Sequence, residues 1–314
     1  MVTLTYGDIK HAADRIAGHT RPVTVAPVDP EAFPGAQVWL ALEFMQHTGS
    51  FKARGAQNFI AAHREAGTLP EAGVTIASGG NAGLACAWAA QQAGVRATVF
   101  LPENAPTVKV GRLRDYGAEV RLGGAEYAEA AAACAEFAAT SGALASHAYD
   151  HPLIAAGAGT LLEEIRQQVS GLDTVIVAVG GGGLFSGVAT AAQHHGVRTV
   201  AVEPERCRAL NAAVGAARPV DVPVDSIAAD SLGARRASEM ALHAAQHDDV
   251  CSVLVPDAEI IRARRALWDH RRLLVENGAA TALAALTSGA YRATDGETVA
   301  VVLCGANTNP ADLG

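Results

Sequence analysis

Residues 175–192 read VIVAVGGGGLFSGVATAA: five apolar residues, four consecutive glycines and an Ala-rich segment. The apolar residues predict a buried strand, and the segment after Gly183 predicts a helix. Glycines between a strand and a helix leave backbone N–H groups unhindered at the positive helix N-terminus, where an anion binds well. Since a tight turn needs only one or two glycines, the run from Gly180 to Gly183 favours a phosphate site over a purely structural turn.

On both sides of this stretch, short β-branched segments alternate with Ala-rich segments of helical period, and no repeat is present. Strands are expected at 37–44, 74–77, 97–101, 119–122, 174–179, 199–202 and 298–303. Helices are expected at 83–92, 105–116, 125–140, 155–169, 184–194, 256–274 and 281–290. Residues 203–251 mix Pro, Gly and Asp without a sustained period, so no regular element is predicted there. The alternation predicts an α/β fold with mostly parallel sheets flanked by helices.

Composition narrows the class of protein. The 314 residues carry a net charge of -8 and only 5% aromatics, which disfavours nucleic acid as a partner because a polyphosphate backbone needs clustered Lys and Arg. No segment reaches the roughly 18 consecutive apolar residues that span a bilayer, and the N-terminus does not read as a signal peptide. Five scattered cysteines without a C-x-x-C pair fit a reducing compartment. We therefore predict a cytoplasmic protein without a membrane partner.

The chain has only three lysines, Lys10, Lys52 and Lys109. Lys52 lies in HTGSFKARGAQNFI (47–60), after a Gly-Ser-Phe turn and at the start of an expected helix. The positive helix terminus and nearby Arg54 would favour its neutral, nucleophilic amine. A lysine near a helix start is usually solvated, so this segment indicates chemistry only in combination with others.

Two more segments end strands at the edge where the tetraglycine loop is expected. IASGGNAGLACAWAA (76–90) again joins a strand to a helix, and its Ser78 and Asn81 can hydrogen-bond a carboxylate beside backbone donors, although alone it could be a simple turn. VVLCGANTNP (301–310) places Cys304 at the carboxyl end of the last strand. A buried cysteine is more often part of a core than of a reaction.

A dinucleotide-binding oxidoreductase is an alternative interpretation of the glycine run. Glu203 ends the next expected strand, 20 residues after Gly183, where an acid contacts the ribose in Rossmann domains. However, the G-x-G-x-x-G pattern is broken, because its third glycine would be Phe185 or Ser186. This alternative is therefore the weaker one.

Together these segments resemble the fold-type II pyridoxal-phosphate (PLP) enzymes, and among them the serine/threonine dehydratase (threonine ammonia-lyase) and serine racemase group. The resemblance covers most of the chain: S-F-K-x-R-G-A around Lys52, S-x-G-N-A-G from Ser78, P-x-x-A-P-x-x-K from Pro102, YGAEV from Tyr116, HAYDHPLIAAGAGTLLEEI from His147 and the tetraglycine loop. It implies a two-domain, tryptophan synthase β-like fold: a large PLP-binding domain from residues 1–45 and 148–314, and a small domain from residues 46–147. It also implies a homodimer.

The resemblance implies that PLP contacts Phe51, Lys52, Asn81, Gly180, Gly181, Gly182, Gly183 and Cys304. Lys52 would hold PLP as a Schiff base, Phe51 would pack on the pyridine ring and Asn81 would bond the 3-hydroxyl. The glycine run would bind the phosphate and Cys304 would face the ring nitrogen. The substrate carboxylate would lie against Ser78, Gly79, Asn81 and Ala82. A neutral thiol at the ring nitrogen makes PLP a weaker electron sink, which suits rapid loss of a β-leaving group.

By resemblance, the expected reaction is the PLP-dependent β-elimination of water from a small-molecule 3-hydroxy amino acid, such as L-threonine or L-serine, to a 2-oxo acid and ammonia. Lys52 would remove the α-proton. A serine racemase-like isomerase and a PLP β-replacement synthase remain alternatives. Racemisation requires a second acid/base opposite Lys52; serine racemases carry a serine there, and this chain has Gly79.

Two motifs depart from the family pattern and leave the identity of the substrate open. The A-D-G loop reads AADSLGA with Ser231 for Gly, and I-E-P-[ST]-[GA] reads VENGAA around Glu276. The resemblance also implies a cation site at Glu203, but Ala209 stands where a second carboxylate is expected. A monovalent cation held mainly by carbonyl groups is therefore expected rather than Mg²⁺. His147 and His151 are expected in a loop, without a metal.

Overall fold

Two β-sheets organise the chain in the computed structural model, which describes residues 3–313. The first sheet has the order β1-β2-β10-β7-β8-β9, and only its β1–β2 pair is antiparallel. Its strands are β1 (Val25–Pro27), β2 (Gln37–Ala41), β7 (Thr174–Ala178), β8 (Arg198–Pro204), β9 (Val250–Val255) and β10 (Thr298–Val302). The second sheet, β5-β4-β3-β6, is parallel throughout. Its strands are β3 (Val74–Ile76), β4 (Ala97–Leu101), β5 (Glu119–Leu122) and β6 (Leu144–Ala145).

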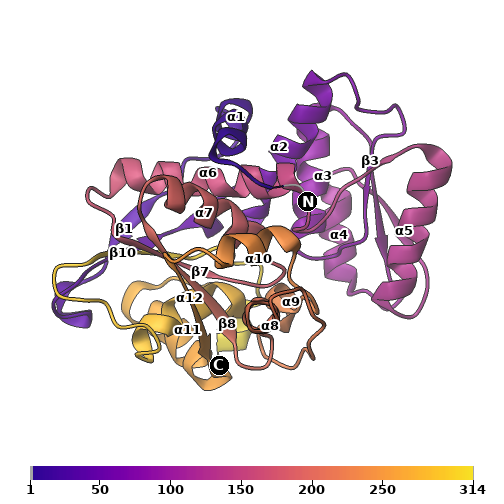
Figure 1. The fold of residues 1–314 in the computed structure, drawn as a ribbon. Helices are drawn as coiled ribbons and strands as arrows, with labels where there is room; N and C mark the ends of the chain where they lie inside the picture. The colour runs from indigo at the N-terminus through magenta and orange to yellow at the C-terminus, as the bar shows by residue number, and fades with distance from the viewer. Residues whose placement is uncertain (1–2, 314) are drawn as a thin grey trace.

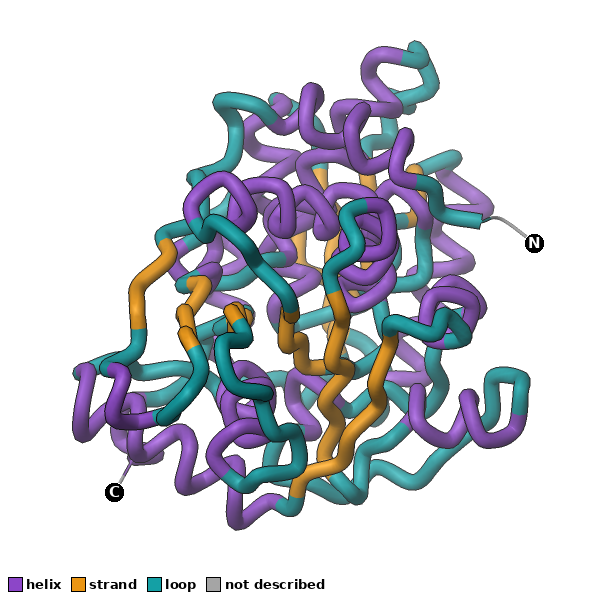
Figure 2. Tube along the Cα trace, turned by 60° about the vertical axis from the view of Figure 1, so that its left-hand side comes forward, coloured by secondary structure: helices purple, strands orange, loops and turns teal. Residues whose placement is uncertain are grey.

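Helices pack around the sheets (Figure 2), and the central strands β3, β4, β7 and β10 are buried throughout. The longer helices are α1 (Tyr6–Ile16), α2 (Lys52–Glu65), α3 (Asn81–Ala93), α4 (Thr107–Asp115), α5 (Tyr127–Ser141), α6 (Pro152–Gln168), α7 (Gly183–His194), α11 (Asp257–Arg271) and α12 (Asn277–Thr287). Shorter ones are α8 (Ala209–Ala216), α9 (Ala229–Leu232), α10 (Glu239–Ala245) and the 3₁₀ turns η1 (Pro30–Ala32), η2 (Glu43–Met45), η3 (His47–Gly49) and η4 (Pro310–Leu313). The α/β fold with parallel sheets flanked by helices is thus confirmed.

The two sheets belong to two lobes. Helices α2 to α5 and the second sheet form the right-hand lobe of Figure 1, and the first sheet with α6 to α12 forms the left-hand one. All strands of the second sheet fall within residues 46–147, and all strands of the first fall outside them. Each sheet has its own large apolar cluster. The limits of the two domains stay a prediction of the resemblance.

Glycines let three helices pack closely where the lobes meet. Helix α6 packs against both α2 and α7. A Cβ at Gly55 of α2 would lie 2.6 Å from the carbonyl oxygen of Ile154 of α6, and one at Gly159 of α6 would lie 2.7 Å from that of Gly187 of α7. Backbones this close exclude any side chain. Helix α6 therefore fixes the starts of α2 and α7, which carry Lys52 and the tetraglycine loop, relative to each other.

The structure corrects the prediction that residues 203–251 contain no regular element. They include the end of β8, the helices α8, α9 and α10, and the start of β9. These helices have 8, 4 and 7 residues, too short for the 3.6-residue period to repeat clearly. The short strands β1 and β6 were also missed, because three and two residues show no alternation.

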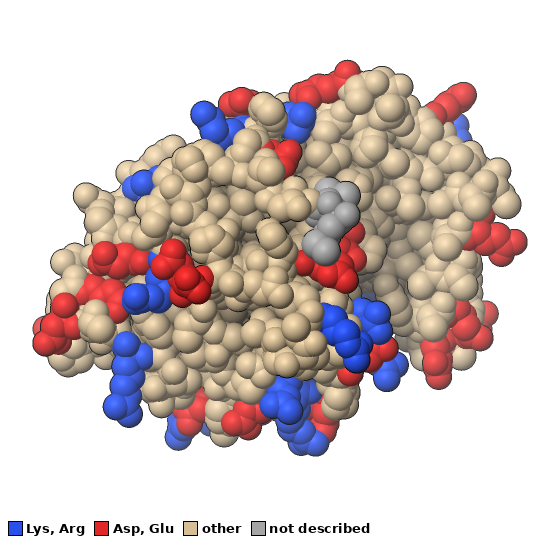
Figure 3. All heavy atoms as spheres, viewed as in Figure 1, with Lys and Arg blue, Asp and Glu red and all other residues tan. Residues whose placement is uncertain are grey.

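Charged side chains are scattered over the face shown in Figure 3, which is hollowed between the two lobes. Among residues 3–313, no helix is long and apolar enough to cross a membrane.

Candidate active site

The segments singled out in the sequence meet between the two lobes. The N–H of Phe51 donates to the carbonyl of Cys304 at 2.9 Å, and Ser50 forms an antiparallel bridge with Gly305. The start of α2 is thereby joined to the segment after β10, 253 residues further along the chain. Because parallel strands end at one edge of a sheet, the loop after β7 reaches the same region.

Lys52 is the first residue of α2 and is part-buried. Its Nζ donates to the carbonyl of Ala148 at 2.6 Å and lies 4.8 Å from the centre of the Phe51 ring. Burial lowers the pKa of Lys52 to about 8, although Cys304 and Glu276 nearby oppose the shift. About a tenth of the amine is therefore neutral at pH 7, far more than for an unperturbed lysine, and a nucleophile or base must be neutral.

The tetraglycine loop has the geometry of an anion cradle. The backbone N–H groups of Gly181, Gly182 and Gly183 are buried at the start of α7 and have no acceptor among residues 3–313. Buried N–H groups are almost always satisfied, so this arrangement fits an external anion. Side chains are excluded: a Cβ at Gly181 would lie 2.4 Å from ring carbons of Tyr149, and Gly182 has a φ of 99°. The loop therefore fits the phosphate of PLP.

A second helix start, that of α3, carries the predicted substrate residues. Ser78, Gly79, Asn81 and Ala82 are all part-buried. The backbone N–H groups of Asn81 and Ala82 have no acceptor within the part of the chain that the structure describes, so they can bind a carboxylate. The Ser78 hydroxyl accepts a weak hydrogen bond from the N–H of Gly80 at 3.4 Å.

Cys304 is 4% exposed, and burial raises the pKa of its thiol far above the usual range. The thiol is therefore neutral at physiological pH, as the sequence interpretation requires. Phe51, whose N–H donates to the Cys304 carbonyl, is part-buried beside it.

Two polar residues of the site were not singled out from the sequence as site residues. The Asn81 amide nitrogen donates to both carboxylate oxygens of Glu276, at 3.0 and 3.1 Å, and its oxygen accepts from Asn307 at 2.7 Å. Glu276 is 4% exposed, and burial raises the pKa of its carboxyl to about 7. Both residues lie in the segments VENGAA and VVLCGANTNP, but Asn81, to which they hydrogen-bond, is about 200 residues away along the chain. Nothing local could have indicated the pairing.

Tyr149 was also missed. Its ring packs on Gly181, and its hydroxyl donates to the carbonyl of Arg236 at 3.3 Å. His151 caps the start of α6 by accepting from the N–H of Leu153. His147, as predicted, lies in the loop between β6 and α6.

Glu203 has an additional role that the sequence did not suggest. Its side chain is fully buried at the end of β8, and its two oxygens accept from the N–H groups of Leu210 and Asn211 at 2.8 and 2.7 Å. The carboxylate therefore caps the start of α8. Burial nevertheless raises its pKa to about 7. Cation binding by Glu203 stays a prediction, and among residues 3–313 no three His, Cys, Asp or Glu side chains cluster as a metal site.

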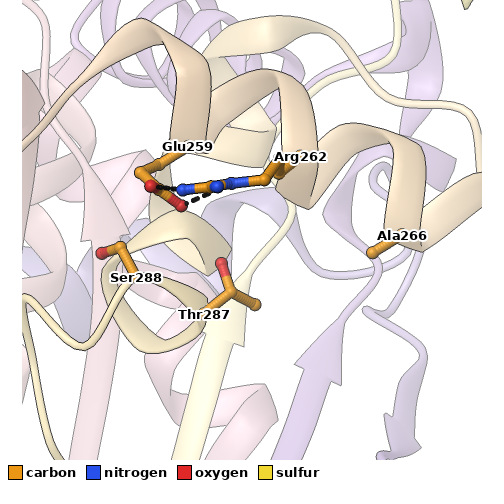
Figure 4. A pocket seen from close by; sticks show the side chains of 5 residues that line it. All are labelled: Glu259, Arg262, Ala266, Thr287 and Ser288. Carbon is orange, nitrogen blue, oxygen red and sulfur yellow. Dashed lines mark hydrogen bonds and ion pairs between the residues drawn. The ribbon is translucent and has the colours of Figure 1, made fainter.

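A separate hollow of about 360 Å³ lies on α11 and the end of α12 (Figure 4). Glu259 and Arg262 form an ion pair at its edge, facing Thr287 and Ser288. Its lining includes no lysine and no glycine loop. The groups suited to PLP are instead gathered around Lys52.

The fold and the site define a PLP-dependent enzyme: a part-buried lysine at a helix start, a glycine cradle for phosphate and a neutral thiol at the end of the last strand. The chain belongs to the pyridoxal-phosphate dependent enzyme family, whose model matches residues 18–305. This membership removes the basis for the dinucleotide-binding alternative.

Relatives within the family are similar over most of the chain. An L-threonine ammonia-lyase of Geobacter sulfurreducens is 38% identical over 273 residues, covering 85% of this chain and 67% of that protein. A human protein named serine dehydratase-like is 36% identical over 285 residues, 87% of this chain and 86% of its own. The crystal structure of serine racemase from Dictyostelium discoideum superposes with a TM-score of 0.90 at 29% identity, covering 98% of this chain and 100% of that one.

Proposed function

We propose that this protein catalyses the PLP-dependent β-elimination of water from a 3-hydroxy amino acid, with L-threonine or L-serine as substrate. The Cα–H and Cβ–O bonds break, and the α-proton and the hydroxyl leave as water. The remaining enamine is hydrolysed to a 2-oxo acid and ammonia, so the overall reaction needs no oxidant. PLP, when bound, supplies the electron-withdrawing group that makes the α-proton acidic.

The part-buried amine of Lys52 carries this proposal. Its pKa, lowered to about 8 by burial, leaves an amine that can hold the cofactor covalently and then move the α-proton. Gly180 to Gly183 would hold the cofactor phosphate on bare N–H groups, and Phe51 would pack on the ring. The neutral thiol of Cys304 would face the ring nitrogen without protonating it.

The start of α3 would orient the substrate. The N–H groups of Asn81 and Ala82, which have no acceptor among residues 3–313, and the Ser78 hydroxyl offer donors to its carboxylate at a positive helix terminus. The Asn81 amide would bond the 3-hydroxyl of PLP. Gly79 in the same loop would leave space beside the substrate.

Racemisation is the competing reaction, because serine racemases share this fold at 28 to 29% identity. It needs a proton donor on the face opposite Lys52. Gly79, at the position of the racemase serine, has no side chain to supply one. A Cβ there would lie 2.9 Å from the Leu101 Cδ2 atom, which a small rotation of that flexible side chain relieves. Gly79→Ser is therefore a feasible test.

The experiment incubates purified protein and PLP separately with L-threonine, L-serine and 3-phenylserine, and follows 2-oxo acid formation and, by chiral chromatography, the inverted amino acid. We expect 2-oxo acid to form faster than the inverted isomer from L-threonine or L-serine. Faster inversion would overturn elimination. Faster turnover of 3-phenylserine would overturn the proposed substrates while leaving the reaction in place. Added thiol trapped as a β-substituted product in preference to 2-oxo acid would indicate a replacement synthase instead.

Lys52→Ala and Lys109→Ala form a matched pair for the role of the lysine. Lys109 is exposed on α4, so its removal leaves the site intact. We expect the Lys52 variant to lose at least about 10³-fold in kcat and the Lys109 variant to keep wild-type activity. Borohydride reduction followed by peptide mapping should label Lys52, and a label on Lys10 or Lys109 would overturn the assignment.

A cytoplasmic homodimer with a monovalent cation at Glu203 completes the proposal. The family resemblance supports the dimer and the cation, and the carbonyl-rich segment that follows Glu203 also supports the cation. The scattered cysteines without a C-x-x-C pair support the cytoplasm. Sedimentation equilibrium tests the dimer, and a purely monomeric sample at micromolar concentration would overturn it.

A further inference from the structure

Four polar side chains form a continuous hydrogen-bonded row from the outside of α4 to the start of α12. The Arg112 Nη2 atom donates to Asn307 Oδ1 at 2.6 Å, and Asn307 Nδ2 donates to Asn81 Oδ1 at 2.7 Å. Asn81 Nδ2 then donates to the two Glu276 oxygens at 3.0 and 3.1 Å. Arg112 and Asn81 come from the right-hand lobe of Figure 1, and Asn307 and Glu276 from segments packed with the first sheet.

The orientation of the Asn307 amide is determined on both of its sides. A guanidinium has donors only, so the amide oxygen must face Arg112. The amide nitrogen also donates to the backbone carbonyl of Thr48 at 2.7 Å, and a carbonyl only accepts. Turning the amide over would place N–H against N–H and oxygen against oxygen. Arg112 and Thr48 thus select the same orientation.

Asn307 in turn orients Asn81. Because Asn307 presents an N–H group, the Asn81 oxygen must face it, and the Asn81 NH₂ group must point the other way. That NH₂ group then meets the buried Glu276 carboxyl. With the opposite orientation, a part-buried donor and two acceptors would lose their partners.

We propose that Arg112 is a positioning residue for the reaction: acting through Asn307, it holds the Asn81 amide with its NH₂ group toward Glu276, in the orientation in which Asn81 would contact the cofactor. The inference rests on the proposed role of Asn81 at the PLP 3-hydroxyl. Arg112 itself is not among the residues predicted to contact cofactor or substrate. It sets the direction of the row from one end because it has donors alone, and the Glu276 carboxylate, with acceptors alone, sets the same direction from the other end.

The backbone beside the row has conformations and close approaches that leave room for its side chains. Thr48, whose carbonyl accepts from Asn307, has a φ of 63°, unusual for a β-branched residue. A Cβ at Gly49 would lie 2.9 Å from Asn307 Oδ1, and one at Gly305 would lie 2.4 Å from Glu276 Oε1. Side chains at either glycine would displace a member of the row.

Arg112 lies away from the residues of the predicted site. It lines a hollow of about 590 Å³ together with Arg21, His47 of η3, Trp88 of α3 and Tyr116, which follows α4. None of the residues predicted to contact cofactor or substrate lines this hollow. A variant at Arg112 therefore changes the hydrogen-bonded row without changing a residue predicted to contact cofactor or substrate.

The experiment compares Arg112→Met, Arg112→Lys and Arg114→Met in the full chain. Arg114 is exposed on the same helix and makes a matched control. For each variant we would measure the Kd for PLP by absorbance titration, the pH midpoint of the bound-cofactor spectrum, and thermal stability. We expect Arg112→Met to weaken PLP binding about five- to tenfold and to shift the midpoint. Arg112→Lys, which keeps a charged donor, should recover most of the PLP affinity and most of the wild-type midpoint. Arg114→Met should match wild type.

Asn307→Asp tests the direction of the row independently. The new carboxylate would pair with Arg112 but would offer Asn81 only an acceptor. Asn81 would then face acceptors on both sides, so one of its two contacts is lost whichever way its amide turns. We expect more than tenfold weaker PLP binding and a larger shift of the spectral midpoint than with Arg112→Met.

Wild-type affinity and an unchanged midpoint in both Arg112→Met and Asn307→Asp would overturn the proposal. Equal effects of Arg112→Met and Arg114→Met, or no recovery with Lys, would also overturn it, since either indicates a merely structural or general charge effect. The spectra do not depend on turnover. A wild-type protein that binds PLP but forms no 2-oxo acid would therefore refute the proposed function while this inference could still be read from the variants.

Discussion

The loop after β7 and the loop after β3 have the same local design but differ in the side chains that they present to a ligand. Each follows a buried parallel strand, contains several glycines and begins a helix. The β7 loop, Gly180 to Gly183, offers only backbone N–H groups, and neighbouring atoms exclude any side chain at Gly181. The β3 loop also offers N–H groups, but its Asn81 is connected to Glu276 and Asn307, which are 195 and 226 residues away.

This difference separates two kinds of binding site. A backbone cradle depends on local conformation, so four adjacent residues are enough to form it. An oriented amide depends on which groups face it, and those come from other elements.

Gly181→Ala should have the largest effect, because its new Cβ would lie 2.4 Å from the Tyr149 ring. Overpacking of this kind costs about 1–3 kcal/mol, so PLP binding should weaken by about 5- to 150-fold. Gly79→Ala in the other loop meets only the flexible Leu101 side chain and should weaken binding less than about threefold. Absorbance titration with PLP measures both. Equal losses would show that the two loops do not differ as described.

Glu276→Gln should have the next largest effect, on stability and its pH dependence. The carboxyl has a pKa of about 7 in the folded protein against 4.5 in the unfolded chain. Between these values the folded state binds more protons, so stability decreases as pH rises. Glutamine does not titrate, so the variant does not lose this stability. Its free energy of unfolding relative to wild type should be higher at pH 8 than at pH 4 by on the order of 2–3 kcal/mol. Urea unfolding of the cofactor-free proteins at both pH values is the measurement; a pH-independent difference would contradict the buried, raised carboxyl.

Glu203→Ala should have a moderate effect on stability. It removes the acceptor of two helix N–H groups, a loss of about 1–2 kcal/mol. The same variant tests the cation. Wild-type activity should be higher in potassium than in tetramethylammonium, and Glu203→Ala should abolish the difference. Equal wild-type rates in the two salts would leave Glu203 as a helix cap alone.

Cys304→Ser should have the smallest effect, because a hydroxyl is also a neutral partner for the ring nitrogen. We expect kcat within about threefold of wild type, roughly 0.6 kcal/mol. Cys304→Asp is the contrasting variant: it would introduce an acid beside Glu276 and should alter the spectrum of the bound cofactor. If the Asp variant keeps both the wild-type rate and the wild-type spectrum, Cys304 does not contact the ring.

Much of the fold and the site could be predicted from the sequence. The strand–glycine–helix pattern at residues 175–192 and the segment around Lys52 are local signals, since strand burial, bare N–H groups and a helix start arise from neighbouring residues. The residues at 203–251 were not predicted as elements, because short helices complete too few turns to show a period. Family resemblance supplied the assignment of individual residues to PLP.

Only the tertiary structure decided which side chains hydrogen-bond to one another in the site. The sequence by itself determined the parallel α/β fold, the glycine cradle and the candidate lysine, because these depend on backbone conformation and residue type. That Asn81 faces Glu276, that Asn307 and Arg112 orient it, and that Glu203 caps α8 depends on how distant elements pack. Hydrogen bonds between side chains act over about 3 Å in space and leave no period in the sequence.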